Sequence, residues 1–308
     1  MIHNALEHDD RITKIAFIKP SFTAAAYRQS FYVFYTLYQK LHFGKNVTTN
    51  LNLLTSKVTS RKTDSSSSTR GMHYLYENIR ALIPKSKMYM LTDANVDAGS
   101  IFTAKNGLNK YDILVIGHQE YVTRLEYDNL EHFVSSDGTM IILDGNIFYA
   151  EVKYNSNIHT VTLVKGHGRA FNGKSAWKSV SERWKEETSQ WIGSNYLCFR
   201  CGITFSNYPF GYKQHEEQYI TNPHDIILLN YGASMPMPKQ TKQSPMISSS
   251  QQLSINREAY IDTKHIIATY ELRYQKGKVI AFGIYADDVI TGNKFDKYFD
   301  RLLLKNIR

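Results

Sequence analysis

The feature that most constrains the fold is a pair of short apolar segments, residues 111–116 and 139–143, separated by a helical segment at 125–135. The first segment is rich in β-branched residues and stops at Gly117. A buried parallel strand has this composition. Asp137-Gly138 closes the helical segment in the way that helix C-termini favour. The pattern predicts an α/β protein with a mostly parallel sheet flanked by helices.

Polar residues follow both apolar segments. His118 and Glu120 come after the first, and Asp144, Gly145 and Asn146 come after the second. In open α/β sheets, ligands bind beyond the carboxyl ends of the strands. Two residues apart in an extended chain, His118 and Glu120 leave the same face. We therefore expect a proton-transfer group and a potential ligand for a hard metal ion to converge there. The alternative is a surface loop with solvated polar side chains.

The rest of the chain alternates in the same way, and we expect one domain over residues 1–308 with flexible insertions near 55–71 and 233–256. Residues 175–192 read as a helix that carries Trp177, Trp184 and Trp191 on a packing stripe. The other expected elements are strands at 14–18 and 87–91, helices at 22–38, 73–82 and 294–304, and a hairpin of 265–274 with 278–284.

Composition narrows the class of protein. The net charge of +9 is dispersed and accompanied by no helix-turn-helix, zinc-finger or RNA-recognition motif, so we expect a basic surface without a specific nucleic-acid partner. No apolar run is long enough for a bilayer and the first residues do not form a secretory signal, so we expect a cytoplasmic protein. Cys198 and Cys201 are interpreted as reduced structural residues rather than half of a zinc site.

Several motifs resemble one family. The strand that runs into Gly117-His118-Gln119-Glu120-Tyr121 and the later Gly145-Asn146-Ile147-Phe148-Tyr149 are similar to signatures of the large (beta) subunit of N,N-dimethylformamidase. His215-Glu216-Glu217 resembles a weaker acidic motif of those enzymes. The resemblance is clearest over residues 85–230. It implies a three-layer α/β sandwich of the amidotransferase or flavodoxin-like kind.

The resemblance also implies a chemistry. In that family, two tyrosine oxygens and a glutamate hold one iron ion, which acts on the C–N bond of a small amide. Carried over, Glu120 and Tyr27 would be metal ligands for Fe³⁺, His118 and Asn146 would be catalytic, and Glu217 or Glu216 would be a second acid or base. No tyrosine follows Tyr38 before residue 60, so the second tyrosine ligand stays open among Tyr35, Tyr74 and Tyr76.

Two functions of different classes follow from these observations. The first is an iron-dependent amidohydrolase for a small amide, which could form a homo-oligomer. The second is a non-catalytic amidotransferase-like module that binds a small molecule, a carbohydrate or a protein partner. A cysteine-dependent amidotransferase is disfavoured, because the turns after the strands ending at Ile116 and Leu143 carry no cysteine.

Overall fold

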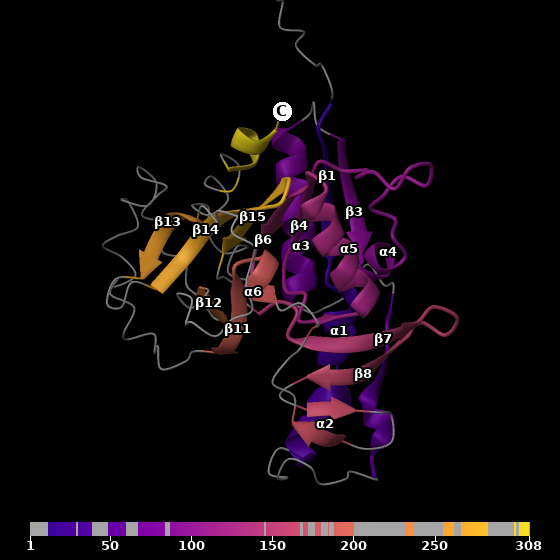
Figure 1. Cartoon of the computed structure of the whole chain (residues 1–308). Helices are drawn as coiled ribbons and strands as arrows, with labels where there is room; N and C mark the ends of the chain where they lie inside the picture. The colour runs from indigo at the N-terminus through magenta and orange to yellow at the C-terminus, as the bar shows by residue number, and fades with distance from the viewer. Residues whose placement is uncertain are drawn as a thin grey trace, which may run out of the picture.

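The computed structural model shows a seven-stranded sheet, a second six-stranded sheet and a two-stranded ribbon, with helices packed around them (Figure 1). The residues that the structure describes are 12–28, 30–38, 49–59, 67–83, 87–144, 146–166, 169–171, 176–179, 184, 188–199, 232–236, 255–261, 266–282, 299 and 302–307. Within them, no helix combines the length and the apolar character that a bilayer-spanning segment needs.

The large sheet has the strand order β13-β14-β15-β6-β4-β1-β3. Its strands are β1 (Lys14–Lys19), β3 (Lys87–Thr92), β4 (Ile113–Ile116), β6 (Thr139–Ile142), β13 (Ile255–Ile261), β14 (Ile266–Tyr274) and β15 (Gly277–Phe282). The five strands from β15 to β3 are parallel, whereas β14 runs antiparallel to both β15 and β13. Strands β4 and β6 are neighbours, with Ile116 opposite Ile142. The predicted α/β class and the predicted hairpin are confirmed.

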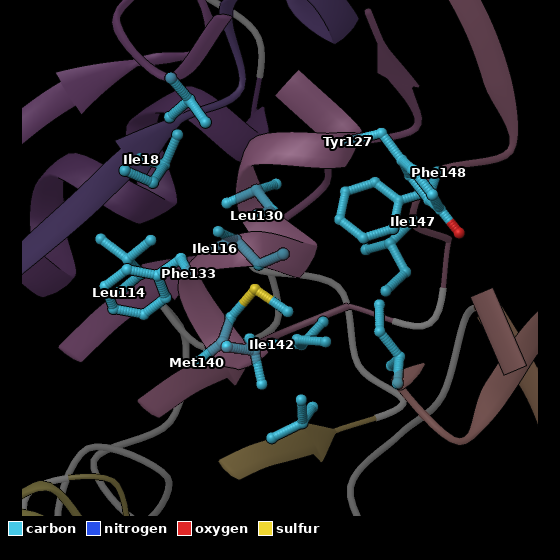
Figure 2. Close-up of a cluster of buried hydrophobic side chains, with 14 of the residues drawn as sticks. Ile18, Leu114, Ile116, Tyr127, Leu130, Phe133, Met140, Ile142, Ile147 and Phe148 are labelled. Carbon is cyan, nitrogen blue, oxygen red and sulfur yellow. The ribbon is translucent and has the colours of Figure 1, made fainter. Parts of the chain in front are cut away.

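Strand β4, an interior strand of the sheet, is buried on both faces, which explains why it is a continuous apolar run. Leu114 and Ile116 face helix α5 (Arg124–Ser135), which contributes Tyr127, Leu130 and Phe133 to that core (Figure 2). Ile113 and Val115 point to the other face, where helix α3 (Ser67–Leu82) packs. The period of two along a strand therefore divides the core into two layers.

The second sheet was not predicted from the sequence. It has the order β10-β9-β8-β7-β5, with β2 also paired to β8. Its strands are β2 (Thr55–Lys57), β5 (Tyr121–Val122), β7 (Ala150–Asn155), β8 (Thr160–Gly166), β9 (Arg169–Phe171) and β10 (Ala176–Ser179). Helices α1 (Ser21–Tyr27) and α2 (Ser30–Tyr38) and the 3-10 turn η1 (Leu51–Leu54) share a core with it, and this assembly lies at the lower end of the view in Figure 1.

The long helix expected at 175–192 is wrong. Residues Ala176–Ser179 form β10, and among the described residues of this stretch only Thr188–Trp191 are helical, as α6. Trp184 and Trp191 are nevertheless buried on the α5 face: the Trp184 ring stacks on Tyr127 at 4.1 Å between centroids, and the indole of Trp191 donates to the Tyr127 hydroxyl. A seven-residue spacing of large aromatic residues indicates that they are buried against a common core, but it does not require that the residues between them form a helix.

Other sequence expectations were partly right. The segment from Phe22 to Tyr38 is two helices rather than one, and the helix expected at 73–82 begins earlier, at Ser67. The insertion near 55–71 contains β2 and the start of α3, and the insertion near 233–256 contains most of β12 (Gly232–Pro236), which pairs with β11 (Ser194–Phe199). Most of the terminal segment 294–304 lies outside the described residues.

Candidate functional site

Three chain segments meet beyond the carboxyl ends of the central strands. The first follows β4 and carries His118 and Glu120, the second follows β6 and carries Asp144 and Asn146, and the third is α1, which follows β1 and ends at Tyr27. The four side chains from the first two segments are at most 4% exposed. Parallel order in the sheet brings these segments to one edge, because β1, β4 and β6 are neighbours.

One carboxylate oxygen is the common partner at this edge. Oε2 of Glu120 accepts a hydrogen bond from the Tyr27 hydroxyl and another, at 3.0 Å, from Nδ2 of Asn146. Nε2 of His118 lies 3.4 Å from the same oxygen and 2.8 Å from the Tyr27 hydroxyl oxygen. The structure thus brings together Tyr27, His118, Glu120 and Asn146. His215, Glu216 and Glu217 lie outside the described residues.

Asp144 is a site residue to which the sequence analysis assigned no role. Its Oδ2 lies 2.5 Å from Nδ1 of His118, and its Oδ1 accepts the backbone N–H of Asn146 at 2.7 Å. The carboxylate therefore orients the imidazole and the turn that presents Asn146. Its position directly after the second apolar segment was the available signal, since every residue at that point faces the same edge.

The charges around His118 raise its pKa by more than burial lowers it. Burial alone lowers the pKa of this imidazole, but the charge of Asp144 and the hydrogen bond to it, followed by Glu120, raise the pKa to about 10. Burial raises the pKa of the Asp144 carboxyl, and the charge of His118 opposes that effect. With Nδ1 bonded to Asp144, a proton on Nε2 points toward Tyr27 and Glu120.

Tyrosine side chains form one wall of the site. Tyr27 packs edge-on against both His118 and Tyr32. Burial, and next the negative charge of Glu120, raise the pKa of Tyr35 well above its usual value. The other two tyrosines considered from the sequence lie elsewhere: Tyr74 is 40% exposed, and Tyr76 packs on Phe17 at the α3 face of the sheet.

The donor set fits a hard cation. No three His, Cys, Asp or Glu side chains of the described residues form a group suited to a metal, so an ion here needs tyrosine oxygens beside Glu120. In addition, Oδ1 of Asn146 is buried and has no hydrogen-bond partner within the described part of the chain. Phenolate, carboxylate and amide oxygens are ligands that hard cations prefer, and a buried acceptor without a donor suits a cation or a substrate N–H group.

Comparisons with known proteins bear on the family rather than on the reaction. No curated protein matches this sequence. The solved structures that resemble it include the GH42 beta-galactosidase Gan42B from G. stearothermophilus, with 10% identity, a TM-score of 0.41 and coverage of 97% of this chain and 31% of that one. This chain therefore spans about a third of the length of the beta-galactosidase.

A second similar structure is the cytoplasmic protein STM1381 from Salmonella typhimurium LT2, with 12% identity, a TM-score of 0.44 and coverage of 96% and 100%. Neither TM-score is high enough to bear on function. The family comparison is of a different kind. The profile of the N,N-dimethylformamidase beta subunit-like, C-terminal family matches residues 2–228. Because that match includes most of the chain, with Glu120 and the three residues gathered around its carboxylate, the protein belongs to the N,N-dimethylformamidase beta subunit-like, C-terminal family.

Proposed function

We propose that the protein is an iron-dependent amidohydrolase that cleaves the C–N bond of a small amide. The observation that carries this proposal is the convergence of Tyr27, His118 and Asn146 on one buried oxygen of Glu120. The site thus combines hard oxygen donors with a histidine and an amide, in a place where parallel α/β sheets bind ligands. Membership of the family adds support for amide hydrolysis.

Glu120 and Tyr27 would hold the iron, and Tyr35, whose hydroxyl is influenced by the charge of Glu120, is our candidate for a second tyrosine ligand. Tyr74 is 40% exposed and Tyr76 packs on Phe17 at the α3 face of the sheet, so we assign neither as a ligand. Bound Fe³⁺ supplies a Lewis acid that polarises an amide carbonyl and acidifies water. Binding would also lower the pKa of the phenols, because the phenolate form is the ligand.

The remaining residues have roles that follow from their contacts. His118, fixed at Nδ1 by Asp144, holds a proton on Nε2 that it can deliver to the leaving amine. Asn146 uses one hydrogen of Nδ2 for Glu120, which leaves the second hydrogen to donate to the substrate oxygen and Oδ1 to accept from a substrate N–H. Glu217, or else Glu216, remains a second acid or base by resemblance alone.

The experiment is the purification of the protein without chelator or affinity metal, followed by iron analysis and a visible spectrum. We expect near-stoichiometric iron and a phenolate-to-iron charge-transfer band. Glu120→Gln should lose iron, colour and activity, because a neutral amide is a poor ligand for a hard cation. Glu151→Gln, on the adjoining strand β7, is the matched control, since Glu151 pairs with Lys165 and not with the site.

Two tyrosine variants separate ligation from packing. Tyr27→Phe should lose the band, whereas Tyr38→Phe on α2 should keep it, because the Tyr38 hydroxyl bonds to Thr49 and Asn50. His118→Ala should retain iron while turnover falls by about 10²–10⁴-fold. A colourless wild-type protein that stays metal-free in iron-rich medium would refute the proposal and favour the non-catalytic binding module.

A further inference from the structure

A second pair of titratable groups is buried outside the candidate site. Asp93 is the first residue of α4 (Asp93–Asp97), directly after β3, and Glu126 lies in the first turn of α5. Both residues are 0% exposed, and a hydrogen bond joins their side chains. The contacts that the structure shows for Asp93 and Glu126 are with residues other than Glu120 and Tyr27.

The hydrogen bonds of this pair indicate that one proton lies between the two carboxyl groups. Oδ2 of Asp93 accepts the backbone N–H of Phe22 at 2.6 Å and the Ser21 hydroxyl at 3.2 Å. Apart from the bond between the two carboxyl groups and the contacts with Gln119 and the Thr123 backbone, Oδ1 of Asp93 and both carboxyl oxygens of Glu126 receive no donor from the described protein groups. Two carboxylates cannot be buried side by side without a neutralising charge, so the bond between them needs a proton on one of them.

Both carboxyl groups of the pair hold a proton more tightly than they would in water. Burial raises the pKa of Asp93 to about 7, although the hydrogen bonds from Phe22, Glu126 and Ser21 and the contact with Gln119 favour its ionised form. Burial, and next the charges of Asp93 and Asp97, raise the pKa of Glu126 well above its usual value. Because both groups are fully buried and a hydrogen bond joins them, the folded pair keeps one proton between the two carboxyl groups.

The pair connects the elements that build the candidate site. Asp93 holds the first residues of α1, the seven-residue helix that ends at Tyr27. Gln119 lies between His118 and Glu120, touches Asp93, and donates to the carbonyl of Ile18 at the end of β1 at 2.9 Å. Displacement of Asp93 would therefore move both the helix that carries Tyr27 and the turn that carries Glu120.

On the α5 side, the Thr123 hydroxyl accepts the backbone N–H of Glu126 at 3.0 Å and donates to Asp97 on α4. The carboxyl pair and Thr123 together join the starts of α1, α4 and α5. Asp97 is the further charged group that acts on the pair, and its negative charge makes loss of the proton less favourable.

We propose that Asp93 and Glu126 share one proton and act as positioning residues, so that α1 holds Tyr27 against Glu120 only while this proton is retained. The proposal concerns the folded chain and does not depend on which substrate the site accepts. Only the part of the test that measures iron retention rests on the proposed function.

The test is the pH dependence of unfolding of the metal-free protein between pH 7.5 and 9. Because the pair keeps a proton in the folded state that both carboxyls lose on unfolding, stability falls as the pH rises toward the folded-state pKa of the pair. One such proton changes the folding equilibrium constant about tenfold per pH unit. In Glu126→Gln, an amide N–H replaces this proton as the donor to Asp93, so that tenfold contribution should disappear.

Asp128→Asn is the matched control, since it removes a carboxylate from the same helix at a side chain that is 54% exposed. It should keep the wild-type slope. If Glu126→Gln does not fold, Asp93→Asn replaces it, because its amide can donate to an ionised Glu126 and should remove the same proton. A slope in the folded variant equal to that of wild type and Asp128→Asn would overturn the proposal.

The positioning effect is read from iron retention over the same pH range. Wild type should lose the charge-transfer band at a lower pH than Glu126→Gln, whereas a merely structural role predicts the same pH for both. If neither protein ever binds iron but the unfolding slopes differ as expected, the shared proton stands and the proposed reaction fails. If both bind iron and their slopes agree, the reaction stands and the shared proton fails.

Discussion

Asp144→Ala is the substitution whose effect the structure defines most closely. The Asp144 carboxylate is the partner of two buried donors, Nδ1 of His118 at 2.5 Å and the backbone N–H of Asn146 at 2.7 Å. Alanine removes both acceptors and leaves no room for bulk water, since His118 and Asn146 are 1% and 4% exposed. The charged imidazole would then be buried without the partner that raises its pKa, so it would give up its proton.

The expected loss in the free energy of unfolding is ~3–5 kcal/mol, the usual cost of removing one partner from a buried charge pair. A domain is typically stable by about 5–15 kcal/mol, so the variant should still fold but at a much lower denaturant midpoint. Asp144→Asn is the informative comparison. Its oxygen can accept from Asn146 and its amide N–H can donate to a neutral His118, so it should cost only about 1 kcal/mol.

Urea unfolding of the metal-free proteins measures both values, with tryptophan fluorescence as the probe because Trp184 and Trp191 are buried. The slopes of the unfolding curves must agree among the three proteins for the comparison to hold. Equal losses for the alanine and asparagine variants, or a loss below about 1 kcal/mol for alanine, would refute the assignment of Asp144 as the acceptor for two buried donors.

Two further substitutions test the fold. Gly277→Ala should lower the free energy of unfolding by about 1–3 kcal/mol or prevent folding, because the new Cβ would overlap the carbonyl oxygens of Val134 and Gly138. Gly107→Ala is the control: it lies in an open turn at φ +66° and should lower the free energy of unfolding by only about 1 kcal/mol. Similar losses for both glycines would contradict the close packing of the β14–β15 turn on α5. Trp184→Phe should cost about 2 kcal/mol in urea unfolding, because it leaves a void beside Tyr127 and removes the donor to the Phe148 carbonyl; an unchanged midpoint would contradict the burial of this indole.

Local sequence patterns were sufficient for the elements around the central strands. The apolar segments at 111–116 and 139–143, the helix between them and the hairpin at 265–284 all form as expected, because each is specified by periodicity and turn residues over a few positions. The same reasoning placed His118, Glu120 and Asn146 at one edge, since parallel neighbouring strands end together.

Local patterns failed where the chain pairs with distant segments. The strands of the second sheet are short and half-buried, and β2 joins β8 across more than a hundred residues, so no window of sequence contains the pairing. The tryptophans at 177, 184 and 191 show a spacing that fits a helix, yet the first lies on a strand, because the pairing of β10 with β9 overrides a weak local preference.

By itself the sequence determined the α/β class, the strands that bear the site and three of its polar residues, because these depend on the order and periodicity of neighbouring residues. Only the tertiary structure decided that Tyr27 reaches Glu120, that Asp144 orients His118, and that Asp93 meets Glu126. Each of these contacts joins residues about 26 to 93 positions apart and depends on how whole helices dock on the sheets, which no local pattern encodes.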